Sequence, residues 1–300
     1  MKKPLISVVI PAYNHEAFIG PAIDSVLSQS QGDLELIIVD DGSTDNTAEV
    51  IKSYTDPRIS YIWQENQDAY NTINRGMGMA RGKYISILNS DDVYTPGRFE
   101  KCLQAIEQHK AEVVFSDVTP INDQGEPLND PGFGWNVWHQ KNREYYFRYA
   151  DVYTGFLHGN YMVTTSNLFM TREAVEKTGD FTPLRYLHDY DYIFRLMLAC
   201  PDKVVYMHAE QLLYYRIHGG NTLSEAAITG REQDLQVIEK YMLGVLPEAY
   251  RQYVATGSDR LRELDREITE VKAELAQLQQ RDPASLSRRA LGRLKRMLAS

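Results

Sequence analysis

The stretch Val39-Asp40-Asp41-Gly42-Ser43-Thr44-Asp45-Asn46-Thr47 follows directly on an apolar run at 34–39. A short apolar run that ends in two acids and a glycine is typical of a buried strand that opens into a polar loop. In open parallel sheets, ligands bind beyond the carboxyl ends of the strands. The carboxylates of Asp40 and Asp41 can accept hydrogen bonds from a base or a ribose. The pattern therefore favours a ligand-binding loop over a plain polar turn.

The residues on either side of this loop alternate between strand-like and helix-like runs. Strand candidates lie at 5–10, 34–39, 59–63, 84–88, 113–115, 203–206 and 211–216. Helix candidates lie at 16–29, 46–54, 69–80, 96–109, 190–199 and 222–253. Asn46 and Glu49 have the spacing of a capping box at the start of the second helix. This alternation predicts an α/β fold with a mostly parallel sheet and helices on both faces.

A second polar turn, Asn89-Ser90-Asp91-Asp92, follows the apolar run 84–88. Paired carboxylates at short spacing suit a hard divalent cation, whose remaining ligands are phosphate and water oxygens. An Asp-Asp turn also commonly caps a helix, so this turn alone leaves both interpretations open.

Composition excludes several classes of protein. The chain has 300 residues and a net charge of −9, which argues against nucleic acid as the main partner. Cys102 and Cys200 lie far apart without metal-ligand spacing, so we expect reduced thiols of a cytoplasmic protein. No apolar stretch approaches the roughly 18 residues of a membrane span, and the first apolar run is too short for the core of an export signal.

The stretch 117–165 lacks a clear period but is rich in aromatic residues, among them Trp135 and Trp138. That aromatic content argues against disorder. We expect this stretch to form a wall of the binding site or a mobile lid, where specificity for the ligands resides.

The segment 257–281 has apolar residues at alternating spacings of three and four, with charged residues between them. These positions are Leu261, Leu264, Ile268, Val271, Leu275 and Leu278. Heptads with apolar a and d positions predict a short coiled coil that joins copies of the chain, as a dimer or a trimer. A single amphipathic helix packed on its own domain is the alternative.

The segment 282–300 begins with Asp282-Pro283, which ends the preceding helix. On a helical wheel, the apolar residues of 285–298 fall on one side and its five basic residues on the other. This separation predicts a helix that lies in an anionic membrane surface, with a solvated basic tail as the alternative. Oligomerisation would strengthen such an anchor through avidity.

The polar turns become specific when they are combined with the first strand, Val8-Val9-Ile10-Pro11-Ala12-Tyr13-Asn14. Further segments are Glu65-Asn66-Gln67-Asp68, Asn74-Arg75-Gly76, Arg81-Gly82-Lys83-Tyr84-Ile85, and Tyr215-Arg216-Ile217-His218. In this order, over roughly residues 5–218, the set resembles the family 2 glycosyltransferases of the GT-A fold. Many members of that family have glycine where this chain has Asp68.

The resemblance implies a GT-A glycosyltransferase domain at 1–220. A helical extension at 221–256, the coiled coil at 257–281 and the basic membrane-surface helix at 282–300 would follow it.

The resemblance also implies roles for individual residues. Asp40 would read the base, and Asp91 would bind Mg²⁺ or Mn²⁺, with His218 as a second ligand. Asn89 stands where the family's D-x-D motif has its first aspartate. The residues expected to bind the nucleotide sugar are Pro11, Tyr13, Asn14, Asp40, Asp41, Asn66, Asn74, Arg75, Asn89 and Ser90.

The segment 187–196 resembles the family's Glu-Asp-x-Asp-(x)3-Arg-Leu motif. Asp189 matches the aspartate that acts as general base in the family. His188 replaces the glutamate of that motif and is itself a rival base.

The resemblance therefore implies an inverting, metal-dependent glycosyltransferase. A nucleotide diphosphate sugar, with UDP-sugars favoured, would be the donor. A glycan or lipid-linked acceptor in surface-polysaccharide synthesis would receive the sugar at the inner membrane surface. The alternative function is a catalytically degenerate domain that serves as a coiled-coil scaffold or binds sugar nucleotides.

Overall fold

The computed structural model describes residues 3–184, 187–219, 229–245 and 266. The chain divides into two compact units, Met1–Ile238 and Glu239–Ser300. The first unit contains the sheet and every predicted site residue. The predicted coiled coil, apart from Arg266, and the predicted membrane-surface helix lie outside the described residues.

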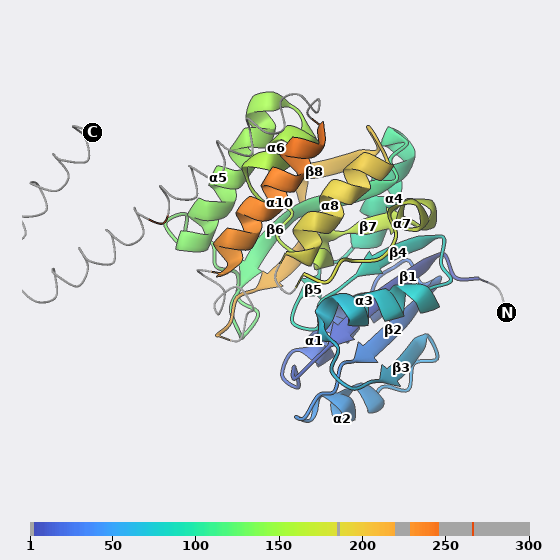
Figure 1. Ribbon diagram of the computed structural model, residues 1–300. Coiled ribbons are helices and arrows are strands. Elements are labelled where there is room, and N and C mark those ends of the chain that lie inside the picture. Colours follow the sequence, from blue (N-terminus) through green and yellow to red (C-terminus); the bar gives the residue numbers. More distant parts are fainter. Residues whose placement is uncertain (1–2, 185–186, 220–228, 246–265, 267–300) are drawn as a thin grey trace, which may run out of the picture. The chain divides into compact units, whose positions relative to one another are not determined.

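A single mixed sheet forms the centre of the first unit (Figure 1). Within the described residues it has eight strands in the order β3-β2-β1-β4-β7-β6-β8-β5. The strands are β1 (Ile6–Ala12), β2 (Leu34–Asp40), β3 (Ile59–Trp63), β4 (Tyr84–Ile87), β5 (Val93–Tyr94), β6 (Val113–Ile121), β7 (Phe169–Thr171) and β8 (Val204–Arg216).

Most pairs in this sheet are parallel. β1 pairs in parallel with β2 and β4, β2 with β3, and β6 with β8. β7 runs antiparallel between β4 and β6, and β5 runs antiparallel to β8. The predicted α/β fold with a mostly parallel sheet is therefore confirmed.

Helices of the first unit pack on the sheet, several of them through an apolar stripe. In α1, the buried side chains Ile19, Ala22, Ile23 and Val26 recur at helical spacing. α3 packs on β1 and β2, and α4 packs on β6 and β8. The helices are α1 (Ile19–Leu27), α2 (Thr47–Lys52), α3 (Asp68–Met79), α4 (Arg98–His109), α5 (Gly134–Tyr149), α6 (Val152–His158), the short 3₁₀ helix η1 (Thr165–Asn167), α7 (Arg172–Thr178), α8 (His188–Ala199) and α10 (Thr229–Val245).

The structure corrects several local expectations. The aromatic stretch 117–165 contains the helices α5 and α6, which pack on each other. Strands β5 and β7 have two and three residues, too few for a period to be visible in the sequence. The predicted capping box is wrong, because Asn46 makes no side-chain cap. Instead, the Asp45 carboxylate accepts a hydrogen bond from the backbone N–H of Thr47 at 3.0 Å.

Gly76 permits a close approach between α3 and β1. A Cβ atom at Gly76 would stand 2.3 Å from a methyl group of Val9. We expect Gly76→Ala to lower the free energy of unfolding by about 1–3 kcal/mol, because the added methyl group overpacks this contact. In the same helix, a Cβ at Gly78 would have no neighbour within 4 Å. Gly78→Ala is therefore the matched control and should stabilise the protein by about 0.5–1 kcal/mol. Chemical denaturation measures both, and equal effects would contradict the close contact.

Asp68 has a backbone φ of +68°, in the left-handed region that glycine adopts most readily. This conformation explains why glycine is common at the corresponding position of the family that the sequence resembles.

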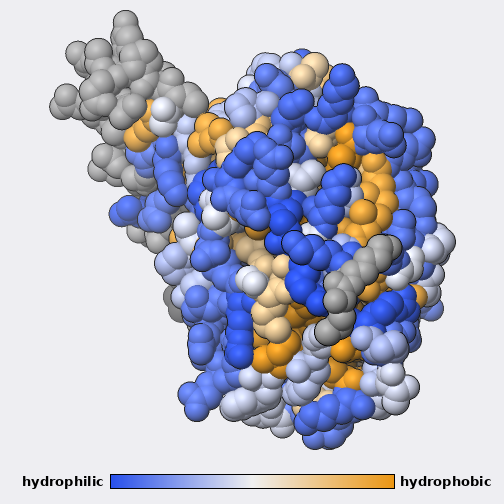
Figure 2. Space-filling model, turned by 90° about the vertical axis from the view of Figure 1, so that its right-hand side faces the viewer, coloured by the Kyte–Doolittle hydropathy of each residue, from blue (hydrophilic) through white to orange (hydrophobic). Residues whose placement is uncertain are grey.

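The surface of the first unit mixes polar and apolar side chains. The face in Figure 2 has bands of apolar residues bordered by hydrophilic ones. Among the helices that the structure describes, none is both long and apolar enough to span a membrane.

Candidate active site

The loops that carry the predicted site residues follow strand ends at one edge of the sheet. Ala12 at the end of β1 pairs with Asp40 at the end of β2, and Val9 pairs with Ile87 at the end of β4. Because these three strands are parallel, the loops after β1, β2 and β4 emerge at the same edge. The tertiary structure thus brings the polar turns of the sequence together.

The loop after β2 is held rigidly around Asp40. The Asp40 side chain is fully buried, and its two oxygens accept hydrogen bonds from the Ser43 N–H and the Tyr61 hydroxyl, each at 2.9 Å. Burial, together with this bond to Asp40, raises the pKa of Tyr61. Asn14 supports the same loop, since its Oδ1 accepts a hydrogen bond from the Thr44 N–H at 2.8 Å.

Asp41 belongs to a second network, which links β2 to α3. Its Oδ1 accepts hydrogen bonds from Gln64 Nε2 at 2.6 Å and from the backbone N–H of Gln67 at 2.9 Å. Arg75 donates to Gln64 Oε1 at 2.7 Å. Gln64, which the sequence patterns do not single out, therefore joins Asp41 to Arg75.

The other predicted donor-site residues differ in their placement. Tyr13 is 47% exposed beside the loop after β1, whereas Pro11 lies within β1 and pairs with Val39. The Asn74 amide bonds to both backbone groups of Phe181, at 2.8 and 2.9 Å, so it positions the segment before α8. Asn66 accepts a hydrogen bond from the Asp68 N–H at 3.4 Å.

Three side chains near the end of β4 form a candidate metal centre. Ligand atoms of His15, Asp91 and His218 all lie within 4.8 Å of one another. His218 Nε2 is 3.1 Å from Asp91 Oδ2, and His15 Nδ1 is 2.7 Å from the hydroxyl of Ser90. The structure thus brings together the two predicted ligands, Asp91 and His218, and adds His15 from the loop after β1.

The charges in this cluster favour metal binding. Burial raises the pKa of Asp91, but the hydrogen bond from His218 and the charges of His15 and His218 outweigh that effect and lower it below its ordinary value. Burial lowers the pKa of His15. An ionised carboxylate and a neutral imidazole are the forms that bind cations.

Asn89 and Asp92, on either side of Asp91 in the turn after β4, bond this turn to the rest of the fold. Asn89 donates to Thr164 Oγ1 and accepts from Thr165 Oγ1, both at 3.0 Å. Asp92 is fully buried and accepts hydrogen bonds from Ser166 Oγ at 2.6 Å and the Arg216 N–H at 3.0 Å. Burial and the charge of Asp91 raise the pKa of Asp92 well above its ordinary value. Asp92 therefore joins β4 to η1 and β8, outside the three-ligand cluster.

The candidate base Asp189 lies in the first turn of α8 and is 7% exposed. Its carboxylate accepts hydrogen bonds from Asn160 Nδ2 at 3.0 Å and from the Tyr190 N–H at 2.8 Å. Burial raises the pKa of Asp189, although the charge of His188 and the hydrogen bond from Asn160 oppose the shift. The Nδ1 atom of His188 lies 3.3 Å from the backbone carbonyl of Leu184. Asn160 has no signal in the sequence, because it stands in the irregular loop after α6.

Tyr215, near the end of β8, is a buried phenol whose pKa responds to carboxylates of the metal centre and of the candidate base. Burial raises the pKa of its hydroxyl, and the charges of Asp92, Asp91 and Asp189 raise it further. All three carboxylates therefore act on this one phenol. The arrangement places a proton acceptor and a cation-binding cluster in the same region of the protein.

Comparisons with known proteins agree with this arrangement. The profile of the family Glycosyl transferase family 2 matches residues 7–178. The chain is 30% identical to the uncharacterized glycosyltransferase RP339 of Rickettsia prowazekii over 231 residues, which cover 74% of this chain and 67% of that protein. It is 26% identical to the chondroitin synthase of Escherichia coli over 253 residues, covering 82% of this chain and 34% of the synthase.

Solved structures share the fold at low sequence identity. Residues 1–349 of S. aureus TarS, in complex with UDP-GlcNAc, superpose with a TM-score of 0.62 and 17% identity, covering 83% of this chain and 69% of that one. The mannosyltransferase PcManGT of Pyrobaculum calidifontis, in complex with GDP-Man and Mn²⁺, superposes with a TM-score of 0.57 and 16% identity, covering 86% and 70%. The family match and the shared fold lead to one conclusion: this chain is a member of glycosyl transferase family 2.

Proposed function

We propose that this chain transfers a sugar from a nucleotide diphosphate to an acceptor hydroxyl, with inversion at the anomeric carbon and with a divalent cation. The observation that carries the proposal is the His15–Asp91–His218 cluster beside the strand ends, in a fold that also holds the buried carboxylate of Asp189 in the first turn of α8. The family membership limits the reaction class to glycosyl transfer.

The residues of the cluster fit a divalent cation. One carboxylate and two imidazoles offer three ligand atoms within 4.8 Å of one another, which leaves positions for oxygens of the donor's diphosphate. Imidazole ligands suit transition metals better than Mg²⁺, so this set favours Mn²⁺. A bound cation would supply neutralisation of the negative charge on the leaving nucleoside diphosphate.

Side chains of the protein would accept the proton and bind the nucleoside. Asp189 takes the proton from the acceptor hydroxyl as its oxygen attacks the anomeric carbon from the face opposite the diphosphate. Asn160 orients the Asp189 carboxylate through their 3.0 Å hydrogen bond. In this proposal the nucleoside binds at the loops after β1 and β2, where the exposed ring of Tyr13 stacks on the base and the fully buried Asp40 holds the loop in place.

The names of relatives and structural neighbours support a choice of donor and acceptor. UDP-sugars are our first choice for the donor, supported by the UDP-GlcNAc named with TarS. A growing polysaccharide or its lipid-linked precursor is our choice for the acceptor, supported by the chondroitin synthase among the relatives.

Hydrolysis of a panel of UDP-, dTDP- and GDP-sugars tests the proposal directly. We expect release of one nucleoside diphosphate with Mn²⁺ and none with a chelator, because the cation stabilises the leaving group. Binding without hydrolysis would mean that turnover requires the acceptor, and adding glycan acceptors would then restore it. Neither binding nor release from any donor would favour the scaffold alternative instead.

We also propose that the enzyme works at the cytoplasmic membrane surface as an oligomer, through residues 257–300. The sequence pattern supports this location, since five basic residues of 284–300 fall on the side of a helical wheel opposite an apolar stripe. Deleting 284–300 should reduce binding to vesicles with anionic lipids by at least tenfold, measured by co-sedimentation at low salt, because each basic residue near the surface contributes about 1 kcal/mol. The full chain with neutral vesicles is the control, and unchanged binding after the deletion would contradict the proposed anchor.

A further inference from the structure

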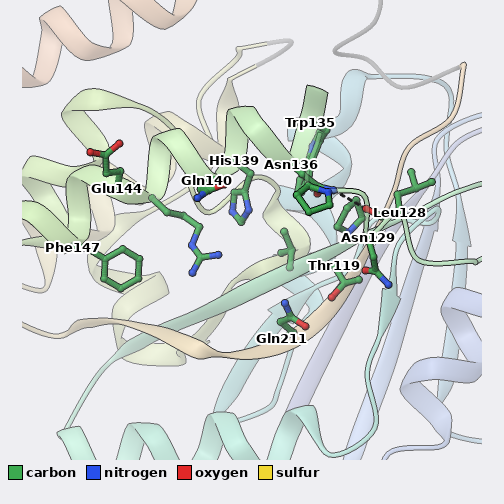
Figure 3. A pocket seen from close by; sticks show the side chains of 14 residues that line it. Thr119, Leu128, Asn129, Trp135, Asn136, His139, Gln140, Glu144, Phe147 and Gln211 are labelled. Atoms are coloured by element: carbon green, nitrogen blue, oxygen red, sulfur yellow. Dashed lines mark hydrogen bonds between the residues drawn. The ribbon is translucent and has the colours of Figure 1, made fainter. Parts of the chain in front are cut away.

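A groove of about 490 Å³ lies between α5 and the strands β6 and β8 (Figure 3). Side chains of α5, including His139 and Asn136, project from one side, and Thr119 and Gln211 project from the strands. Its volume is in the range of about 300–1,000 Å³ that is common for small-molecule sites. None of the nucleotide-binding residues predicted from the sequence lines it.

The lining of the groove combines aromatic rings with side-chain amides. Trp135 and Phe147 stand at different turns of α5, and Phe147 is half exposed. Four amides, from Asn129, Asn136, Gln140 and Gln211, complete the polar part. Asn136 already donates to the carbonyls of Leu128 and Asp130, both at 2.7 Å, so the amides of Asn129, Gln140 and Gln211 are the ones that match the hydroxyl groups of a sugar. Aromatic faces suit the apolar C–H surface of a sugar.

The charges in the groove disfavour an anionic ligand. Among the described residues that line it, Arg143 is the only lysine or arginine, and it pairs with the buried Asp117 at 2.6 Å. Burial and the charge of Arg143 lower the pKa of His139 to about 4, so this imidazole is neutral at pH 7. Glu144, also in the lining, pairs with Arg148 at 2.7 Å. No cation among these described side chains is left for a phosphate.

The groove lies against the candidate catalytic region. His139 Nε2 is 3.3 Å from the carbonyl of Tyr161, whose neighbour Asn160 bonds to Asp189. At the other end, the Trp135 ring stacks on Tyr215 with centroids 5.7 Å apart. The first contact joins the groove wall to the segment that holds Asn160 on the proposed base, and the second joins it to the end of β8.

We propose that this groove binds an uncharged saccharide unit of the acceptor, beyond the hydroxyl that receives the sugar. The inference rests on the proposed transferase function but concerns a site separate from the donor. A neutral glycan stacks against Phe147 and bonds to the amides of Gln140 and Gln211, while its reacting end extends toward Asp189.

Saccharide binding by the full chain, without metal or donor, tests this directly. The probes are cellobiose, lactose and N,N′-diacetylchitobiose, with glucose 6-phosphate as the anionic comparison, measured by ligand-detected NMR titration. We expect at least one neutral disaccharide to bind, and to remain bound when UDP and Mn²⁺ are added. We expect Gln140→Ala to lower the affinity for this disaccharide about fivefold, because one hydrogen bond is lost. Phe147→Ala should weaken it about tenfold or more, and Phe147→Trp should restore the affinity.

Gln108→Ala is the matched control, because Gln108 is an exposed glutamine on α4 outside the groove. Its affinity for the disaccharide should equal that of the unmodified chain, and thermal melting confirms that the variants fold equally. The inference is overturned if no neutral disaccharide binds, if the groove variants bind as well as the control, if UDP displaces the sugar, or if glucose 6-phosphate binds more tightly. Donor hydrolysis is measured separately, so a failure here does not depend on the proposed function.

Discussion

Asp189→Asn should lower kcat by roughly 10³-fold while the affinity for the nucleotide sugar changes little. Asparagine keeps the shape of the side chain and can still accept the 3.0 Å hydrogen bond from Asn160, but it cannot take a proton. Steady-state kinetics of transfer, together with calorimetric titration of the donor, measures both quantities. His188→Gln is the control for the rival base and should retain most of the turnover. Full activity of the Asp189→Asn enzyme, with loss of activity in His188→Gln, would reverse the assignment.

The same substitution should leave the protein at least as stable at neutral pH. Burial raises the pKa of Asp189, so the folded protein holds this proton more tightly than the unfolded chain. Protonated Asp189 therefore stabilises the folded protein at acidic pH. This stabilisation is lost as the pH rises through the pKa that Asp189 has in the folded protein. Asparagine cannot ionise, so thermal melting at pH 7 should show no decrease in Tm. A clear decrease in Tm would indicate a structural role for Asp189 in place of the catalytic one.

Asp91→Asn should weaken Mn²⁺ binding by roughly 100-fold and lower kcat by about 10²–10³-fold. Asp91 provides the only carboxylate of the three-ligand cluster, and its negative charge attracts the cation. Calorimetric titration with Mn²⁺ in the presence of UDP measures the affinity, and the electron paramagnetic resonance signal of free Mn²⁺ provides a second readout.

Asp92→Asn is the contrast for Asp91. Asp92 is adjacent in sequence, but its oxygens accept bonds from Ser166 and the backbone of Arg216. This variant should therefore bind Mn²⁺ within about threefold of the unmodified chain, a change below 1 kcal/mol. His15→Asn should weaken Mn²⁺ more than Mg²⁺, because imidazole prefers transition metals. Equal Mn²⁺ affinity in the Asp91 and Asp92 variants would refute the ligand assignment.

The fold could be predicted from the sequence because its elements are determined locally. The runs that become β1, β2 and β4 are apolar except for Ser7, Glu35 and Ser86 and the terminal Asp40, so they stand out without any tertiary information. Asp40, Asp41 and Asp91 could be found for the same reason, since each directly follows such a run. Helices α5, α6 and α7 were missed, as were the strands β5 and β7. These two strands are too short for a period and are held in place by the longer strands that pair with them.

The sequence by itself determined which residues end the strands and which family the chain resembles. The tertiary structure decided which side chains meet. His15 from the loop after β1, Asp91 from the turn after β4 and His218 beyond β8 lie together, although the last two are 127 positions apart in the sequence. It also decided that Asn160 forms a hydrogen bond with Asp189 and that Asn74 bonds to the backbone of Phe181. The physical reason is that strand formation depends on neighbours in the chain. A metal or catalytic site, in contrast, depends on how parallel strands bring distant loops to the same edge of a sheet.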